Sequence, residues 1–254
     1  MRRPLVLAIL TALLGATLAM AAPTSSSALD TASATAPAVD TSPPAVGSCH
    51  NLTSKEARRR ADGKPAVDCD SRHTTLTIKI ARFSNPDWSL GPKMNRKISK
   101  KCMRGLVKYF DGRTKRIQLS GYMVYNFIPK WRQRNAGANW VRCDIALPRP
   151  RWMPPLPGNG NPPLGRPPLA DNIARCLKSI KGTYYYTTCN AGHQVKATRV
   201  IKTRYDRYPG RKNIERDAER RCGNRLGRKL AVYEFPPRTW WKAGLTHFVC
   251  YERD

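Results

Sequence analysis

The chain has 254 residues, with 46 Lys or Arg and 17 Asp or Glu, and its formal net charge at pH 7 is +29. That length allows one large domain or two modest ones. The charge attracts polyanions, whether nucleic acid, anionic wall polymer or an anionic membrane face, and four histidines are too few for a His-rich metal site.

The first residues are typical of an export signal. Arg2 and Arg3 supply a positive start, an apolar run covers 5–18, and a small-x-small cleavage box stands at 19–21. We therefore predict a signal peptide over residues 1–21. The apolar run is short for a membrane span, and the mature chain has no other long apolar stretch, so no transmembrane helix is expected in it. These features predict a secreted, extracytoplasmic protein.

Residues 22–46 consist mainly of Ala, Thr, Ser and Pro. A segment so poor in large apolar side chains cannot bury enough surface to fold, so we predict a disordered linker. Folding is expected to begin near Cys49. The segment 54–61 predicts a short helix capped by Ser54.

A Cys-x-x-x-His box occurs twice, at 69–73 and at 189–193. In each copy another cysteine follows 33 positions after the cysteine of the box. Each copy has four cysteines: Cys49, Cys69, Cys102 and Cys143 in the first, and Cys176, Cys189, Cys222 and Cys250 in the second. We interpret the chain as a tandem duplication of one four-cysteine module. Module 1 is predicted over 47–147 and module 2 over 171–254, with a Pro-rich spacer at 148–170 between them.

Eight cysteines in an exported chain predict disulfides, with zinc binding at the two boxes as the alternative. Sequence alone permits three pairings within a module. Because the interval of 33 is the one that both copies keep, we favour a bond between the second and third cysteines. The favoured pairs are Cys69–Cys102, Cys189–Cys222, Cys49–Cys143 and Cys176–Cys250.

Strand and helix patterns recur in both copies. Branched apolar residues alternate over 75–83, which predicts a half-buried strand, and 195–201 is its less regular counterpart. Apolar residues then recur every four positions, which predicts a helix with a cysteine on its buried face. These residues are Met94, Ile98, Cys102, Leu106 and Phe110 in the first copy, and Ile214, Ala218, Cys222, Leu226 and Leu230 in the second.

Two strands are predicted after each helix, at 122–128 and 140–147 and again at 231–235 and 246–251. The predicted fold class is therefore α+β, with two tandem disulfide-stapled modules that each combine a small sheet and one main helix. Nine prolines at 148–168 predict a semi-rigid spacer, and a polyproline docking ligand is the alternative.

His73 and His193 stand at matched positions, so one explanation should serve both. A catalytic role would need a partner repeated in the same way, but Asp70 is matched by Asn190. We therefore predict two structural histidines that hydrogen-bond the backbone.

No further catalytic signature is found. The sequence has no Gly-x-Ser-x-Gly, phosphate loop, His-Glu-x-x-His or dinucleotide motif. His50 and His247 have no counterparts, and we interpret them as incidental. Four tryptophans could stack on sugars, although core packing is favoured for them: Trp131, Trp140, Trp240 and Trp241. We predict no catalysis, no cofactor and no metal.

Basic residues follow three- and four-residue steps along one side of each predicted helix. They are Lys97, Lys101, Arg104 and Lys108 in the first copy, and Arg221, Arg225 and Arg228 in the second. A purely solvated face is the alternative, but self-repulsion at this net charge costs stability unless a polyanion or counter-ions offset it. We predict nonspecific polyanion contact through these faces, without recognition of a nucleic-acid sequence. The sequence does not indicate an oligomeric state.

The cysteine and histidine pattern, with Gly47 before Cys49 and a tryptophan and glycine before Cys143, resembles the septum-formation-related domain of exported actinobacterial proteins. The second copy resembles it through the same box and through Gly244 before Cys250. The resemblance implies a role at the cell envelope and a link to septum formation, and it implies no reaction. Both copies lack the acidic residue that this family tends to have before its first cysteine.

Together these patterns predict a non-catalytic, exported cell-envelope protein that binds or scaffolds anionic polymer through its basic faces. The alternative is a secreted hydrolase that acts on cell wall or nucleic acid.

Overall fold

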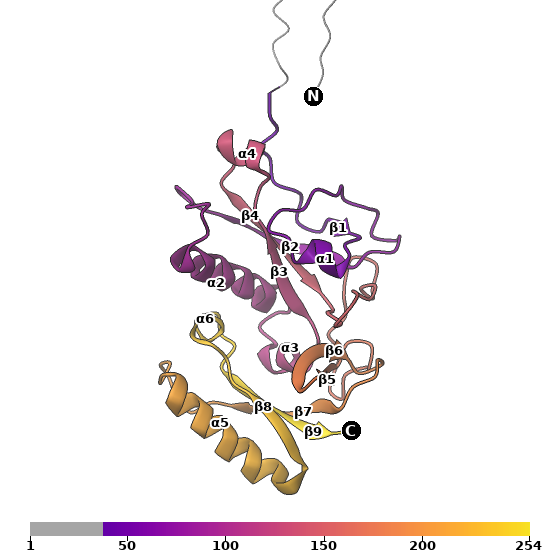
Figure 1. Ribbon diagram of the computed structural model, residues 1–254, viewed down its shortest axis with the longest axis vertical. Helices are drawn as coiled ribbons and strands as arrows, with labels where there is room; N and C mark the ends of the chain where they lie inside the picture. The colour runs from indigo at the N-terminus through magenta and orange to yellow at the C-terminus, as the bar shows by residue number, and fades with distance from the viewer. Residues whose placement is uncertain (1–37) are drawn as a thin grey trace, which may run out of the picture. The chain divides into compact units, whose positions relative to one another are not determined.

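The computed structural model describes residues 38–254, and Figure 1 shows two antiparallel sheets with helices packed beside them. One sheet belongs to each predicted module, so the predicted α+β class is confirmed. The predicted signal peptide and most of the predicted linker lie outside the described residues.

Module 1 contains a four-stranded sheet with strand order β1-β2-β4-β3. Its strands are β1 (Cys49–His50), β2 (Thr75–Arg82), β3 (Met123–Phe127) and β4 (Trp140–Ala146). Its helices are α1 (Ser54–Ala57), α2 (Pro92–Tyr109), α3 (Thr114–Leu119) and α4 (Trp131–Asn135).

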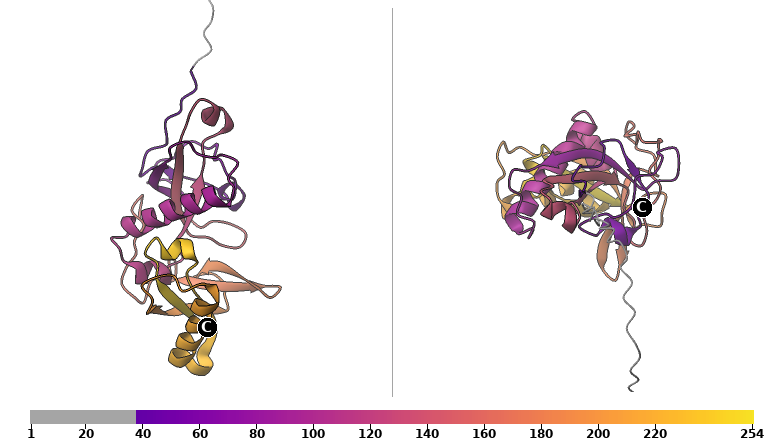
Figure 2. Two further views of the ribbon diagram at one scale, coloured as in Figure 1. Left: turned by 90° about the vertical axis from the view of Figure 1, so that its left-hand side faces the viewer. Right: turned by 90° about the horizontal axis from the view of Figure 1, so that it is seen from above.

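Module 2 contains a five-stranded sheet with strand order β6-β5-β7-β9-β8. Its strands are β5 (Arg175–Ile180), β6 (Thr183–Thr188), β7 (Val195–Lys202), β8 (Leu230–Glu234) and β9 (His247–Arg253). Its helices are α5 (Arg211–Leu226), a 3-10 turn at Gly227–Lys229, and α6 (Arg238–Trp241). In module 1 the place of β6 is taken by a single bridge between Cys49 and Val67, and Figure 2 shows the β5–β6 hairpin of module 2 projecting at the side of the molecule.

The strand registers of the two modules match, which is compatible with the predicted duplication. Thr77 of β2 lies opposite Asp144 of β4, and the ladder then shifts by one residue. Ala197 of β7 lies opposite Tyr251 of β9, and the ladder shifts at the same place. A bulge kept at one position in both copies makes the two central strand pairs equivalent, residue by residue.

The two long helices bury the apolar stripes that the sequence predicts. Met94, Ile98 and Leu106 of α2 are buried, as are Ile214 and Ala218 of α5. The second predicted stripe ends too late in the sequence, because α5 stops at Leu226 and Leu230 already begins β8. Gly227, the C-cap of α5, has a positive φ that terminates the helix.

Helix α1 is shorter than predicted and has a different cap. Thr53 accepts a hydrogen bond from the Glu56 amide, and the Glu56 carboxylate accepts one from the Thr53 amide. Ser54 is therefore the first helical residue, and the prediction of a serine cap was wrong. A threonine followed three residues later by glutamate is the sequence pattern of this capping box.

All eight cysteines form disulfides, but the favoured pairing was wrong. The bonds are Cys49–Cys69, Cys102–Cys143, Cys176–Cys189 and Cys222–Cys250. In each module the first pair joins the first strand to the loop that carries the Cys-x-x-x-His box, and the second pair joins the long helix to the last strand. The constant interval of 33 spans a strand and the first turns of a helix, so it reports a shared framework and not a bond.

A single core cluster crosses the boundary between the modules. It joins Leu106 and Ile117 of module 1 to Leu245 of module 2. Helix α3 lies against β7 and β9, where Leu119 packs on the apolar face of the second sheet. The predicted spacer contributes three buried leucines to the same cluster, which are Leu156, Leu164 and Leu169. The spacer is thus anchored in the core along much of its length.

The end of the predicted linker packs on module 1. The Trp140 indole Nε1 donates to Thr41 O at 2.9 Å, and Gln133 Nε2 donates to Asp40 O at 3.0 Å. Among the described residues, none of the helices combines the length and apolarity needed to span a membrane.

Candidate functional site

Helix α2 carries an uncompensated positive charge. Its 18 residues include seven Lys or Arg and no Asp or Glu. The four predicted polyanion-binding residues Lys97, Lys101, Arg104 and Lys108 are all exposed, and we call them the α2 basic face. None of the four forms an ion pair within residues 38–254.

Lys79 of β2 reports the electrostatic potential beside this face. Its pKa is lowered, first by burial and then by the charges of Lys101, Lys108 and Arg104. Lys101 also donates to Arg82 O and lies over the Phe83 ring, with Nζ 4.6 Å from the ring centroid. The site therefore disfavours one more positive charge, which is what a surface that attracts anions should do.

The predicted basic face of module 2 is organised differently. Buried Asp217 lies 3.9 Å from an Arg221 nitrogen and accepts a hydrogen bond from Arg220 at 2.7 Å. Arg221 also donates to Lys202 O. Arg225 is exposed on α5, while Arg228 lies in the following 3-10 turn and not on the helix. This face is thus partly neutralised and not continuous.

Both matched histidines hydrogen-bond the backbone, as predicted. His73 Nδ1 donates to Ser71 O at 2.9 Å, and His193 Nδ1 donates to Ala191 O at 2.7 Å. Each ring fixes the turn that leads from a disulfide into a strand. Cys176 and Cys189 are bonded to each other, so neither offers His193 a thiolate with which to share a zinc ion.

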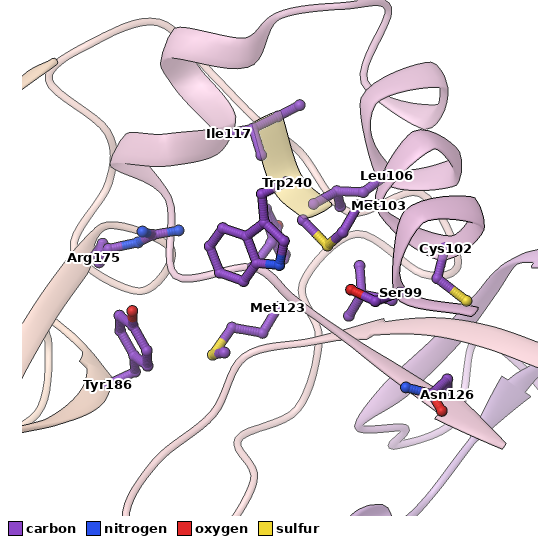
Figure 3. Close-up of a pocket in the computed structure, with 12 residues that line it drawn as sticks. Ser99, Cys102, Met103, Leu106, Ile117, Met123, Asn126, Arg175, Tyr186 and Trp240 are labelled. Atoms are coloured by element: carbon purple, nitrogen blue, oxygen red, sulfur yellow. The ribbon is translucent and has the colours of Figure 1, made fainter. Parts of the chain in front are cut away.

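A small pocket lies where the two modules meet, and Figure 3 shows Trp240 at its centre. Met103 of α2 and Met123 of β3 form part of its wall, and Arg175 and Tyr186 approach from module 2. Its volume is about 80 Å³, which is smaller than the usual size of a ligand site. We interpret it as imperfect packing at the module junction.

Module 1 contains a buried network of charged side chains that lies on β2 and β4 and includes Asp62. Arg142 Nη2 lies 2.8 Å from Asp62 Oδ2 and 3.0 Å from Asp144 Oδ2. Asp144 also accepts hydrogen bonds from Thr75 and Thr77. Burial raises the pKa of Asp144 to about 6, although Arg142 and the two hydroxyls oppose that shift. This network was not predicted, and its signal in the sequence is a set of polar residues at inward positions of two strands.

One end of the network resembles a catalytic triad. Ser48 Oγ lies 3.2 Å from His50 Nε2, and His50 Nδ1 lies 3.7 Å from Asp62 Oδ2, beside a pocket of about 550 Å³. Burial and Arg142 lower the pKa of His50 to about 4, while Asp62 opposes that shift. Such a histidine is neutral at pH 7 but a weak base. Ser48 Oγ is also within 2.8 Å of Ala45 O, to which it can donate instead.

Module 2 has apolar residues where module 1 has much of this network. By the shared register, Leu177 and Val195 occupy the places of His50 and Thr75. The places of Thr77, Arg142 and Asp144 are taken by Ala197, Val249 and Tyr251. These five module 2 residues form a hydrophobic cluster. The fold therefore does not require the polar network.

The tryptophans divide between core and surface. Trp140 and Trp241 are buried, as the favoured interpretation predicts, whereas Trp131 is 65% exposed. Trp152, for which no role was predicted, is 46% exposed and carries the Arg149 guanidinium over its ring.

No protein-family model, curated protein or solved structure matches this chain. The resemblance to septum-formation-related domains stays a prediction. The four disulfides are typical of a protein that folds in an oxidising compartment outside the cytoplasm.

Proposed function

We propose that this protein is a non-catalytic, extracytoplasmic binding or scaffolding protein that holds anionic polymer on the α2 basic face. The observation that carries the proposal is a helix with seven cations, no acidic residue and, among residues 38–254, no ion pair on its exposed face. Cations spaced along one helix side can contact successive anionic groups of a flexible polymer.

The electrostatics favour this function over a merely solvating role. A solvating surface usually mixes both signs of charge, so that neighbouring groups do not repel each other. Here burial lowers the pKa of Lys79 most, and the charges of Lys101, Lys108 and Arg104 lower it further, so neighbouring cations of this surface repel one another. A bound polyanion would relieve that repulsion, because its negative groups would replace loosely held counter-ions.

The experiment compares two variants that lose the same charge. The test variant carries Lys97→Gln, Lys101→Gln, Arg104→Gln and Lys108→Gln. The matched control replaces four exposed cations of module 2, namely Arg199, Lys229, Lys242 and Arg253, with Gln. Binding to immobilised anionic polymer is measured at fixed salt concentration. We expect the α2 variant to bind at least tenfold more weakly than the control, and equal binding of the two would refute the proposal.

Hydrolysis of wall polymer or nucleic acid is the second candidate, and the Ser48–His50 contact at 3.2 Å is the observation that favours it. Binding is preferred because a histidine with a pKa of about 4 is a weak general base. Turnover of such a polymer that disappears in Ser48→Ala and His50→Gln, but persists in His73→Gln, would replace our proposal with an enzymatic one.

The location that we propose is the cell envelope, with a link to septum formation. This part rests on the resemblance of the two Cys-x-x-x-His boxes to the septum-formation-related family. Localisation of a tagged full-length chain in dividing and non-dividing cells tests it, since an even envelope signal would remove the link to the septum.

A further inference from the structure

A second positively charged site lies where the Pro-rich spacer meets the β5–β6 hairpin. The pocket has a volume of about 460 Å³, within the range of small-ligand sites. Arg149, Arg151 and Trp152 of the spacer form one wall, and Lys178 of β5 forms part of the other. None of the residues that line it is acidic.

Arg149 holds its charge without a carboxylate partner. Its guanidinium donates to Thr188 Oγ1 at 3.0 and 3.2 Å and to Asn190 Oδ1 at 2.7 Å, and both acceptors are neutral. Burial lowers the pKa of Arg149, and no carboxylate is among the causes of that shift. Within residues 38–254, its Nη1 donates to no other group. The side chain is therefore fixed in place, with a positive charge and free N–H groups left to bind an anion.

The residue that accepts from Arg149 differs in charge between the two Cys-x-x-x-His boxes. Asn190 follows the cysteine of its box, and the corresponding residue of module 1 is Asp70. An aspartate at position 190 would keep an oxygen for Arg149 and would also neutralise the guanidinium. The amide provides the hydrogen bond alone.

Trp152 adds an aromatic surface to the pocket. The Arg149 guanidinium lies 4.4 Å from its ring centroid, which orients the indole, and the side chain is still 46% exposed. A large aromatic side chain held in place beside three cations combines a stacking surface with charge recognition.

We propose that this pocket binds one acidic sugar unit of an anionic glycan, with its carboxylate or phosphate on Arg149 and its ring against Trp152. The partner class follows from the proposed function, whereas the site is independent of α2. The four disulfides are typical of a protein that works outside the cytoplasm, and we therefore take the anionic polymer to be a glycan and not a nucleic acid. Lys178 and Arg151 are exposed and lie where they can contact the neighbouring units of the polymer.

The test measures affinity of the full chain for a short oligogalacturonate, for a neutral oligosaccharide of the same length and for single-stranded DNA. Two variants address the pocket, Trp152→Ala and Asn190→Asp. Two matched controls make the same changes elsewhere, Trp131→Ala and Asn135→Asp, both at exposed positions of α4. We expect each pocket variant to weaken oligogalacturonate binding about tenfold or more, and each control to change it less than twofold.

The outcomes separate this proposal from the proposed function. If the α2 variant loses affinity for oligogalacturonate and the pocket variants do not, the pocket proposal fails while the proposed function stands. If the pocket variants lose affinity for oligogalacturonate and the α2 variant does not, the pocket proposal stands and the proposed function fails. The glycan assignment would be overturned if Trp152→Ala weakened the binding of DNA and of oligogalacturonate by the same factor. It would also be overturned if the wild-type protein bound the neutral oligosaccharide as tightly as it binds oligogalacturonate. Thermal unfolding of each variant identifies any loss that arises from misfolding.

Discussion

Buried His50 and Asp144 make stability sensitive to acid in opposite ways. The pKa of His50 is about 4 in the folded chain, against 6.5 for an unperturbed histidine, so the unfolded state takes up a proton that the folded state excludes. The stability that neutral His50 permits is therefore present above pH 6.5 and is lost as the pH falls toward 4. Asp144 has a raised pKa of about 6 in the folded chain, so its protonation stabilises the folded state as the pH falls through the same range.

We predict that replacing His50 separates these contributions. The free energy of unfolding of wild type should fall relative to that of His50→Gln by up to about 3 kcal/mol between pH 7 and pH 4. Urea unfolding at a series of pH values checks this. Parallel stability curves for the two proteins would show that His50 is accessible and titrates normally.

We predict that the Asp62 carboxylate contributes strongly to stability through the buried network, whereas the Asp70 carboxylate contributes little. Asp62→Asn removes one of the two carboxylates that face Arg142, so we expect it to destabilise the protein by about 3 kcal/mol. Asp70→Asn, at an exposed position of the same module, should change stability by less than about 0.5 kcal/mol. Chemical denaturation of both variants measures the difference, and equal effects would contradict the importance of the network.

Individual residues differed in how far the sequence could predict them. The backbone contact of His73 and His193 was predictable because the Cys-x-x-x-His box occurs twice and the contacted carbonyl is only two residues away. His50 was not, because its environment is set by Arg142, which is 92 positions further along the chain. The charge on the α2 basic face was predictable from periodicity, whereas the uncompensated state of Arg149 depends on the fold of the spacer.

At the scale of elements, the disulfides join neighbours along the strand and helix framework. Cys102–Cys143 ties α2 to the central strand β4, and Cys49–Cys69 closes a shorter loop beside β1. The two long helices and the strands around them could be predicted from periodicity, whereas the β5–β6 hairpin and the short helices α3, α4 and α6 were not predicted. The disulfide pairing could not be predicted, because it depends on which strand the buried face of the helix meets, and spacing does not encode that.

Removing the Cys102–Cys143 bond should therefore loosen α2. We predict that the double variant Cys102→Ala, Cys143→Ala loses about 4 kcal/mol, since it opens a loop of 41 residues and leaves space in the core. Thermal unfolding and polymer binding should decline together, because the basic face depends on the position of α2. Full stability in this variant would contradict the pairing.

The two long helices should differ as binding elements although both are basic. Replacing Arg221, Arg225 and Arg228 with Gln should weaken polymer binding less than replacing Lys97, Lys101 and Lys108. The reason is that Arg221 faces buried Asp217, whereas Lys101, which likewise donates to a strand carbonyl, has no carboxylate within ion-pair distance among residues 38–254. Binding of the two triple variants to the same anionic polymer decides this, and a larger effect for the α5 variant would reassign the surface.

At the scale of the whole molecule, the two modules share one core cluster. Leu106 of α2 and Leu245 of module 2 belong to it, and α3 lies against the second sheet. We predict a single cooperative unfolding transition for residues 38–254, with coincident curves from tryptophan fluorescence and from circular dichroism. Two separated transitions would show that the modules unfold independently in spite of this contact.

The positive charge of the chain is far larger than its ion pairs neutralise, and we propose that the α2 basic face uses this charge to bind anionic polymer. The most direct test is the salt dependence of binding to a single-stranded oligonucleotide, used as a uniform polyanion. The slope of log K against log salt should be smaller by about 3 in the variant that lacks the four α2 charges, because fewer counter-ions are released. The matched module 2 variant should keep the wild-type slope. An unchanged slope in the α2 variant would contradict the account.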